Sequence, residues 1–166
     1  MSVTKRMITA PAVIALGANL GDRRATMLAA TRELAETDGV ELTAISSVIE
    51  TPALKPDGVD HDAPAYLNAV ALIATTLTPD ALLAVLNGIE NAHGRVRAER
   101  WGDRTLDLDI VDFAGIVSSS PGLTLPHPRA FERAFVLVPW LEVDADAVLP
   151  GHGRVSDLVA GLKGAS

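Results

Sequence analysis

Cysteine is missing from this 166-residue sequence, and aromatic residues make up only 4% of it. Without cysteine the chain can form neither disulfides nor thiolate metal sites, which suits a reducing compartment. With so few aromatic side chains, the core has to be built mainly from alanine, valine, leucine and isoleucine. Hydrophobic residues contribute 48% and charged residues 21%, a balance typical of a globular protein. We expect a single domain over residues 1–166.

Long apolar runs are missing as well. Residues 1–6 are polar, the apolar run behind them is too short for a signal peptide, and no run approaches the ~20 residues of a membrane span. We therefore expect a cytoplasmic protein with no membrane partner. The net charge of −7 argues against a nucleic-acid partner, because binding a phosphate backbone relies on a basic face.

The hydrophobic pattern predicts strands and helices in alternation. Strands are expected at residues 12–16, 40–50, 66–76 and 105–111, and helices at residues 24–37 and 78–93. This order predicts an α+β fold with a ferredoxin-like βαββαβ core, in which helices pack on an antiparallel sheet. Residues 51–65 are expected to form a loop. The C-terminal additions are a short strand near Ile116, an apolar segment at residues 135–141 and a small helix at residues 155–162.

The most informative stretch is residues 94–110, GRVRAERWGDRTLDLDI. On a strand, the leucines and isoleucine of LDLDI face one way, and Asp107 and Asp109 face the other. Two carboxylates on one face repel each other unless a cation lies between them. Such oxygen ligands suit Mg²⁺, which binds through one or two carboxylates plus substrate phosphates. The alternative is a solvent-facing strand that happens to carry two acids.

Four arginines precede this strand within ten positions, namely Arg95, Arg97, Arg100 and Arg104. A guanidinium group matches phosphate oxygens, so the arginines and the paired aspartates together favour phosphoryl transfer. The alternative is a solvated loop in which the arginines pair with neighbouring acids. Trp101 in the same loop is either a stacking surface or a buried anchor. Neither a P-loop nor the glycine-rich loop of protein kinases occurs.

Six motifs follow one another along the chain: ALGANLGDR (15–23), ETPAL (50–54), YLNAV (66–70), the arginine-rich stretch (94–110), LTLPHPR (123–129) and ERAFVLVPW (132–140). Together they resemble the 6-hydroxymethyl-7,8-dihydropterin pyrophosphokinases of folate biosynthesis. The resemblance implies that the hydroxymethyl oxygen of the pterin attacks the β-phosphorus of ATP and that AMP is released. It also implies two Mg²⁺ ions, ATP and the pterin as the small-molecule partners, and a monomer.

The resemblance assigns roles to individual residues. Asp107 and Asp109 would hold the metal, and Arg95 and Arg104 would be catalytic. The implied ATP-binding residues are Glu90, Arg97, Arg100, Trp101, Ile110, Thr124, His127 and Arg133. The implied pterin-binding residues are Thr51, Pro52, Leu54, Tyr66, Asn68 and Phe135.

The implied pterin pocket is chemically reasonable. A flat polar heterocycle needs an aromatic face, which Tyr66 or Phe135 can supply, and an amide such as Asn68 that both donates and accepts. The alternative is that both aromatic residues belong to the core. His61, His93 and His152 are interpreted as surface residues.

Several positions depart from the family pattern, among them Ala18, where serine is common, and an acidic and somewhat long loop at residues 51–65. Asp103 replaces a proline that is usual there and adds a negative charge, and Gly122 stands where some members carry a phosphate-facing arginine. Two other functions compete with the enzyme, a non-catalytic binding module of the same fold and a single-stranded RNA binder. The aspartates beside four arginines oppose the first, and the acidity and scarcity of aromatic residues oppose the second.

Overall fold

An antiparallel sheet forms the centre of the computed structural model, which describes residues 9–19, 22–51, 53–55, 58–60, 66–93 and 106–164. Its strands are β1 (Ala10–Ala18), β2 (Val40–Ile45), β3 (Ile49–Thr51), β6 (Tyr66–Thr75) and β7 (Leu106–Phe113). They run in the order β2-β6-β1-β7, and β3 also pairs with β6. This order is that of a ferredoxin-like βαββαβ unit, so the predicted fold class is confirmed.

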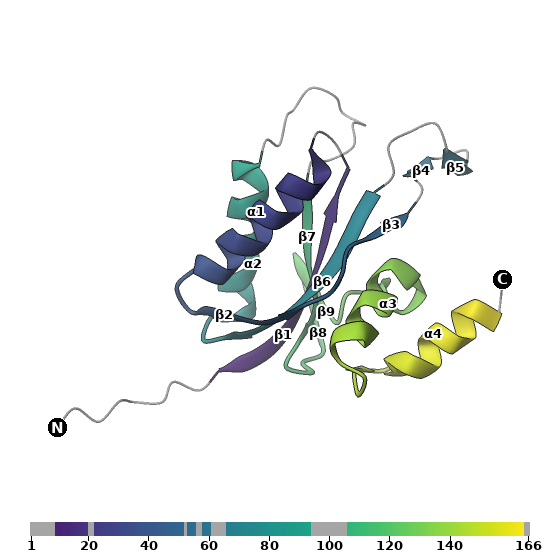
Figure 1. The fold of residues 1–166 in the computed structure, drawn as a ribbon. Helices are drawn as coiled ribbons and strands as arrows, with labels where there is room; N and C mark the ends of the chain where they lie inside the picture. Colours follow the sequence, from purple (N-terminus) through teal and green to yellow (C-terminus); the bar gives the residue numbers. More distant parts are fainter. Residues whose placement is uncertain are drawn as a thin grey trace.

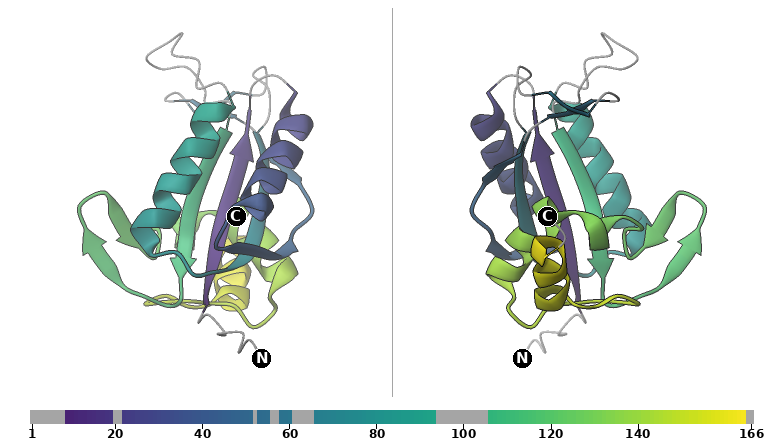
Figure 2. Two further views of the ribbon diagram at one scale, coloured as in Figure 1. Left: turned by 90° about the vertical axis from the view of Figure 1, so that its left-hand side faces the viewer. Right: turned by 90° about the vertical axis from the view of Figure 1, so that its right-hand side faces the viewer.

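Helices cover both faces of this sheet (Figures 1 and 2). α1 (Arg23–Glu36) and α2 (Pro79–Ala92) pack on one face, as the sequence predicts, and α3 (Ala134–Val143) and α4 (Val155–Gly164) pack on the other. Side chains alternate along each strand, so the sheet contributes to two hydrophobic clusters. Ile14 of β1 belongs to the cluster under α1 and α2, whereas Val13 belongs to the cluster under α3 and α4.

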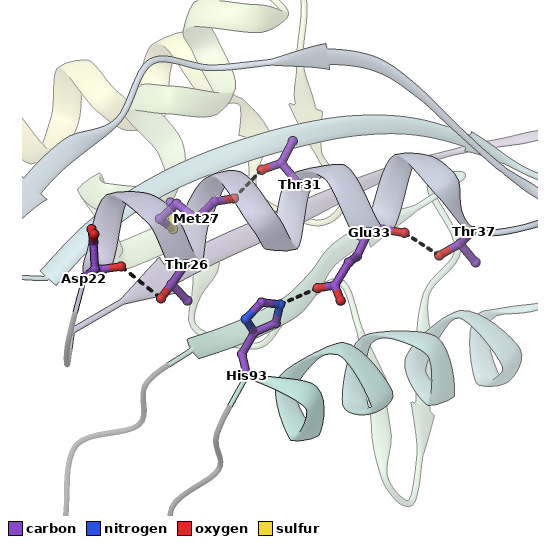
Figure 3. Close-up of polar contacts among 7 residues, drawn as sticks. All are labelled: Asp22, Thr26, Met27, Thr31, Glu33, Thr37 and His93. Carbon is purple, nitrogen blue, oxygen red and sulfur yellow. Dashed lines mark hydrogen bonds and ion pairs between the residues drawn. The ribbon is translucent and has the colours of Figure 1, made fainter.

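The N-termini of α1 and α2 are fixed by local side chains. Thr78 accepts a hydrogen bond from the Ala81 N–H at 3.2 Å, and Pro79 opens α2, as the sequence predicts. Asp22 caps α1 by accepting from the Ala25 N–H at 3.1 Å. Along α1, threonine hydroxyls donate to carbonyl oxygens four residues earlier (Figure 3). These hydroxyls therefore have partners on a helix that is itself partly exposed.

The predicted surface position of His93 is wrong. Its ring contacts the Glu33 carboxylate of α1, and its side chain is only 19% exposed (Figure 3). Sequence periodicity misses this contact because it joins residues 60 positions apart. The pair ties the C-terminal end of α2 to α1.

Several short elements also differ from the prediction. Residues 51–65 contain a hairpin, β4 (Ala53–Lys55) and β5 (Gly58–Asp60), where a loop was expected. The expected strand at 40–50 is interrupted between β2 and β3, because Ser46 pairs with Val70 through both its backbone and its hydroxyl. Three-residue strands carry too little periodicity to be recognised in a sequence.

The segments after β7 form further small units. The strand expected near Ile116 is β8 (Ser118–Ser120), paired with β9 (Leu123–Leu125), and η1 (Ala130–Glu132) leads into α3. β10 (Val148–Leu149) and β11 (Gly153–Arg154) precede α4, which confirms the C-terminal helix. α3 spans the apolar segment at residues 135–141, for which no secondary structure was predicted.

Candidate active site

A cavity of about 570 Å³ opens on the sheet face that carries α3. β1, β3, β6 and β7 provide its floor and one side, and the segment from η1 into α3 provides the other. The lining residues are Ala15, Leu16, Gly17, Thr51, Tyr66, Asn68, Ala69, Asp107, Asp109, Arg129, Glu132, Arg133, Phe135 and Val136. Seven of the predicted site residues that the structure describes are among them, namely Thr51, Tyr66, Asn68, Asp107, Asp109, Arg133 and Phe135. The cavity therefore unites the predicted metal pair with described members of the predicted pterin set.

Strand register determines the floor of the cavity. Gly17 of β1 lies opposite Asn68 of β6 on one side and opposite Asp107 of β7 on the other. A Cβ atom on Gly17 would lie 3.3 Å from the Asn68 Oδ1 atom, which is closer than an ordinary van der Waals contact. The glycine thus keeps the space between an amide and a carboxylate free for a flat ligand.

Asn68 lines the cavity and is buried, with 6% of its surface exposed. Its Nδ2 donates to the Thr51 Oγ1 at 2.8 Å, so Thr51 fixes the orientation of the amide. Thr51 is paired in register with Tyr66, and both line the cavity. An amide held in this way offers its oxygen as an oriented acceptor for a ligand donor.

Asp107 and Asp109 lie on the cavity side of β7. Leu106 precedes the two aspartates and Leu108 lies between them. Both leucines are 3% exposed and face α1 and α2. The predicted alternation along this strand is therefore confirmed. The alternation ends at a β-bulge, where Val13 pairs with Asp112 and Ile14 with Ile110.

The aspartates fit Mg²⁺ and do not fit a fully protein-bound metal. Within the described part of the chain, no group of three or more metal-ligating side chains occurs. Mg²⁺ commonly binds through one or two carboxylates and completes its shell with water and substrate phosphate oxygens. Asp107 and Asp109 supply that number of carboxylates and open onto a cavity where phosphates can enter.

A basic and acidic cluster borders the cavity beside α3. The Arg129 Nε atom lies 2.6 Å from the Glu132 Oε1 atom, and the Arg133 guanidinium lies 5.6 Å from the centre of the Phe135 ring. A cation over an aromatic face is attracted to the ring and holds both groups in place. Arg133 and Phe135 therefore form one ordered side of the cavity.

His127 lies close to this cluster and to Asp109. Its Nδ1 atom accepts a hydrogen bond from the Arg129 N–H at 3.2 Å, so a neutral ring carries its proton on Nε2. Burial lowers the pKa of His127, Asp109 raises it, and Arg133 and Arg129 lower it further. The net effect is a lowered pKa, which favours a neutral imidazole with one N–H to donate.

Comparison with known proteins identifies the family. A sequence model of the family described as 7,8-dihydro-6-hydroxymethylpterin-pyrophosphokinase (HPPK) matches residues 13–145, which is most of the chain. The chain belongs to the HPPK family. The resemblance read from the six motifs is thereby confirmed.

Relatives of the HPPK family match this chain over most of their own length. The 2-amino-4-hydroxy-6-hydroxymethyldihydropteridine pyrophosphokinase of Haemophilus influenzae is 42% identical over 153 residues, which is 92% of each chain. The protein of the same name from Methylorubrum extorquens is 44% identical over 141 residues, 85% of this chain and 87% of that protein. The Bacillus subtilis protein is 42% identical and covers 80% of this chain and 77% of its own.

Solved HPPK structures share the fold. The structure of Plasmodium falciparum HPPK-DHPS A437G with SDX-DHP aligns with 95% of this chain at a TM-score of 0.72 and 14% identity. At that identity the likeness supports the fold alone. This chain spans 46% of the length of that longer protein.

Four described residues expected to bind ATP lie outside the cavity lining, namely His127, Glu90, Ile110 and Thr124. The Glu90 carboxylate of α2 accepts a hydrogen bond from the Leu108 N–H at 2.9 Å, at the edge of β7. Ile110 is 4% exposed and packs in the cluster under α1 and α2. Thr124 is exposed on β9, and its strand contacts β7. Glu90 thus holds the backbone between the two aspartates.

The remaining predicted site residues cannot be placed. Arg95, Arg97, Arg100, Trp101, Arg104 and Pro52 lie outside the described residues, and so does the side chain of Leu54. Gly17, Arg129 and Glu132 also line the cavity and were not predicted as site residues. The available signals were the glycine that follows an apolar strand and the arginine of the LTLPHPR motif. No role was assigned to either of them.

Proposed function

We propose that this HPPK-family chain transfers the diphosphate group of ATP to the hydroxymethyl oxygen of 6-hydroxymethyl-7,8-dihydropterin. The observation that carries the proposal is one cavity that joins an oriented amide, Asn68, to the paired carboxylates Asp107 and Asp109. The relatives at 42–44% identity are named as pyrophosphokinases of this pterin, which supports the same substrate here. This activity would place the chain in folate biosynthesis.

The pterin fits the end of the cavity that Asn68, Thr51, Tyr66 and Phe135 line. The amide oxygen of Asn68 can accept from the polar edge of the heterocycle, while the aromatic side chains offer apolar faces to its flat surfaces. Gly17 leaves room for the ring above the sheet. These contacts would direct the hydroxymethyl group toward Asp107.

ATP fits the other end, where the charged groups lie. In the proposed reaction the hydroxymethyl oxygen forms a bond to the β-phosphorus, the bond from that phosphorus to the α–β bridging oxygen breaks, AMP leaves and the hydroxyl proton passes to solvent. Asp107 and Asp109 would hold two Mg²⁺ ions, which when bound neutralise phosphate charge. Arg133 and the N–H of His127 would orient phosphate oxygens. Arg95 and Arg104 remain the proposed catalytic arginines.

The biological setting belongs to the same proposal. We infer a monomer of one domain over residues 1–166 that acts in the cytoplasm without a nucleic-acid or membrane partner. Among the described residues, no helix has the length and apolar character needed to cross a bilayer. Size-exclusion chromatography with light scattering would test the oligomeric state.

The function is tested by measuring AMP formation from ATP in the presence of Mg²⁺, with and without the pterin. Wild type should form AMP only when the pterin is present, and Asp107→Ala should not. Asp146→Ala is the control, because Asp146 is 95% exposed and lies outside the cavity lining. A folded wild-type protein that makes no pterin-dependent AMP would refute the proposal and favour a binding module.

A further inference from the structure

The segment between β2 and β3 is fastened to two different elements. The Ser47 N–H lies 3.1 and 3.2 Å from the two carboxylate oxygens of Glu142 on α3, and the Ser47 hydroxyl donates to the same carboxylate at 2.8 Å. The neighbouring Ser46 hydroxyl accepts from the Val70 N–H of β6 at 2.8 Å. The segment is thus fixed to the sheet by one serine and to α3 by the next.

This contact joins the two elements that border the proposed pterin site. Thr51 follows Ser47 by four residues, a chain length of at most about 13 Å. Phe135 precedes Glu142 by seven residues on α3, a rise of about 10 Å. Thr51 and Phe135 both line the cavity, and α3 contacts β3 directly. The Ser47–Glu142 contact therefore joins two segments that each lead, within about 10–13 Å, to a residue lining the cavity.

We propose that Glu142 is a positioning residue for the pterin end of the cavity. By holding Ser47 against α3, its carboxylate sets the separation between Thr51 and Phe135. Thr51 orients the Asn68 amide, so a change in that separation alters the amide and the aromatic face together. This inference rests on the proposed function. Of the groups proposed for the phosphate end, Asp107 and Asp109 lie on β7, with which Glu142 forms none of the described hydrogen bonds, whereas Arg133 is the N-cap residue of α3.

The test compares ligand affinities of wild type, Glu142→Ala and Glu142→Gln. Calorimetry would measure the Kd of a non-hydrolysable ATP analogue with Mg²⁺, and then the Kd of the pterin in the presence of that analogue. Glu142→Ala should raise the pterin Kd about fivefold and change the nucleotide Kd by a clearly smaller factor, since a lost hydrogen-bond contact of this kind has a modest net effect. The pterin Kd of Glu142→Gln should lie between those of wild type and Glu142→Ala, because the side-chain carbonyl oxygen of glutamine still accepts from Ser47.

Two further variants control for stability and charge. Ser47→Ala removes one donor and keeps the N–H, so it should raise the pterin Kd less than Glu142→Ala does. Glu36→Ala removes an exposed glutamate of α1 and should change neither Kd. Equal changes in both affinities, or a lower melting temperature with an unchanged pterin Kd, would show that Glu142 is structural only. If wild type itself binds no pterin, the proposed function fails before the variants are compared.

Discussion

Asp109→Asn tests the repulsion between Asp107 and Asp109 separately from their proposed role in binding Mg²⁺. Asp107 and Asp109 are two residues apart on β7, so their side chains are about 6.7 Å apart along the strand. Two like charges at that distance repel each other by about 0.6 kcal/mol in water. Asp109 is exposed, which makes the value for water appropriate. We expect the substitution to raise the free energy of unfolding of the ligand-free protein by about this amount, or its melting temperature by about 1–2 °C.

The same substitution should damage catalysis severely. A neutral amide cannot replace a carboxylate that neutralises Mg²⁺, so pterin-dependent AMP formation should fall by at least ~100-fold. An ATP analogue with Mg²⁺ stabilises wild type in proportion to its occupancy, and it should raise the melting temperature of Asp109→Asn much less. The variant is therefore more stable alone and less stabilised by nucleotide.

Differential scanning calorimetry at pH 8 measures both effects, with and without Mg²⁺ and the ATP analogue. At that pH the lowered pKa of His127 leaves its ring neutral, so no imidazolium offsets the carboxylate repulsion. Asp146→Asn is the charge-matched control, since Asp146 pairs only distantly with Arg154, at 3.8 Å on the surface. A ligand-free Asp109→Asn that is less stable than wild type, or equally stabilised by the nucleotide, would contradict the reasoning.

Three other substitutions test separate parts of the structure. Gly17→Val should raise the pterin Kd at least ~tenfold, because its Cβ meets the Asn68 Oδ1 at 3.3 Å; an unchanged Kd in a calorimetric titration would contradict this. Glu33→Gln should lower the free energy of unfolding in urea by about 1 kcal/mol, because the ring of His93 loses its carboxylate partner, and an unchanged midpoint would contradict that. Burial raises the pKa of Asp112 above its ordinary value of 3.8, so the folded protein binds this proton more tightly than the unfolded chain does. The free energy of unfolding therefore falls as pH rises from 3.8 and Asp112 loses its proton. Asp112→Asn should therefore gain stability relative to wild type over that rise in a pH series of denaturant titrations, where a constant difference would contradict the pKa shift.

The main elements of the fold could be predicted because their signals are local. Thr78 and Pro79 predicted the start of α2, and the alternation of LDLDI predicted both faces of β7. The β4–β5 hairpin and the contact between Glu33 and His93 could not be predicted. The first involves strands of three residues, and the second depends on how two distant helices pack.

The candidate site was predicted only in part, because some of its residues carry a local sequence signal and others do not. Asp107 and Asp109 were identified from spacing and chemistry, and the family resemblance supplied Asn68 and Thr51, which the structure brings together through a hydrogen bond. Glu142 carries no such signal, because a glutamate at the end of an apolar helix has no distinctive spacing. Its contact with Ser47 spans 95 positions and arises only once α3 packs on the sheet.

One face of β1 shows why the cavity opens where it does. That face carries every second residue, namely Val13, Ala15 and Gly17. Their side chains become smaller toward the end of the strand that lines the cavity. Val13 is 7% exposed and packs in the cluster under α3 and α4, whereas Gly17 has no side chain to fill the space between Asn68 and Asp107. The hydrophobic core therefore ends, and the site begins, within four residues of one strand. Because both share the same strand, a larger side chain at Gly17 extends the core at the expense of the cavity.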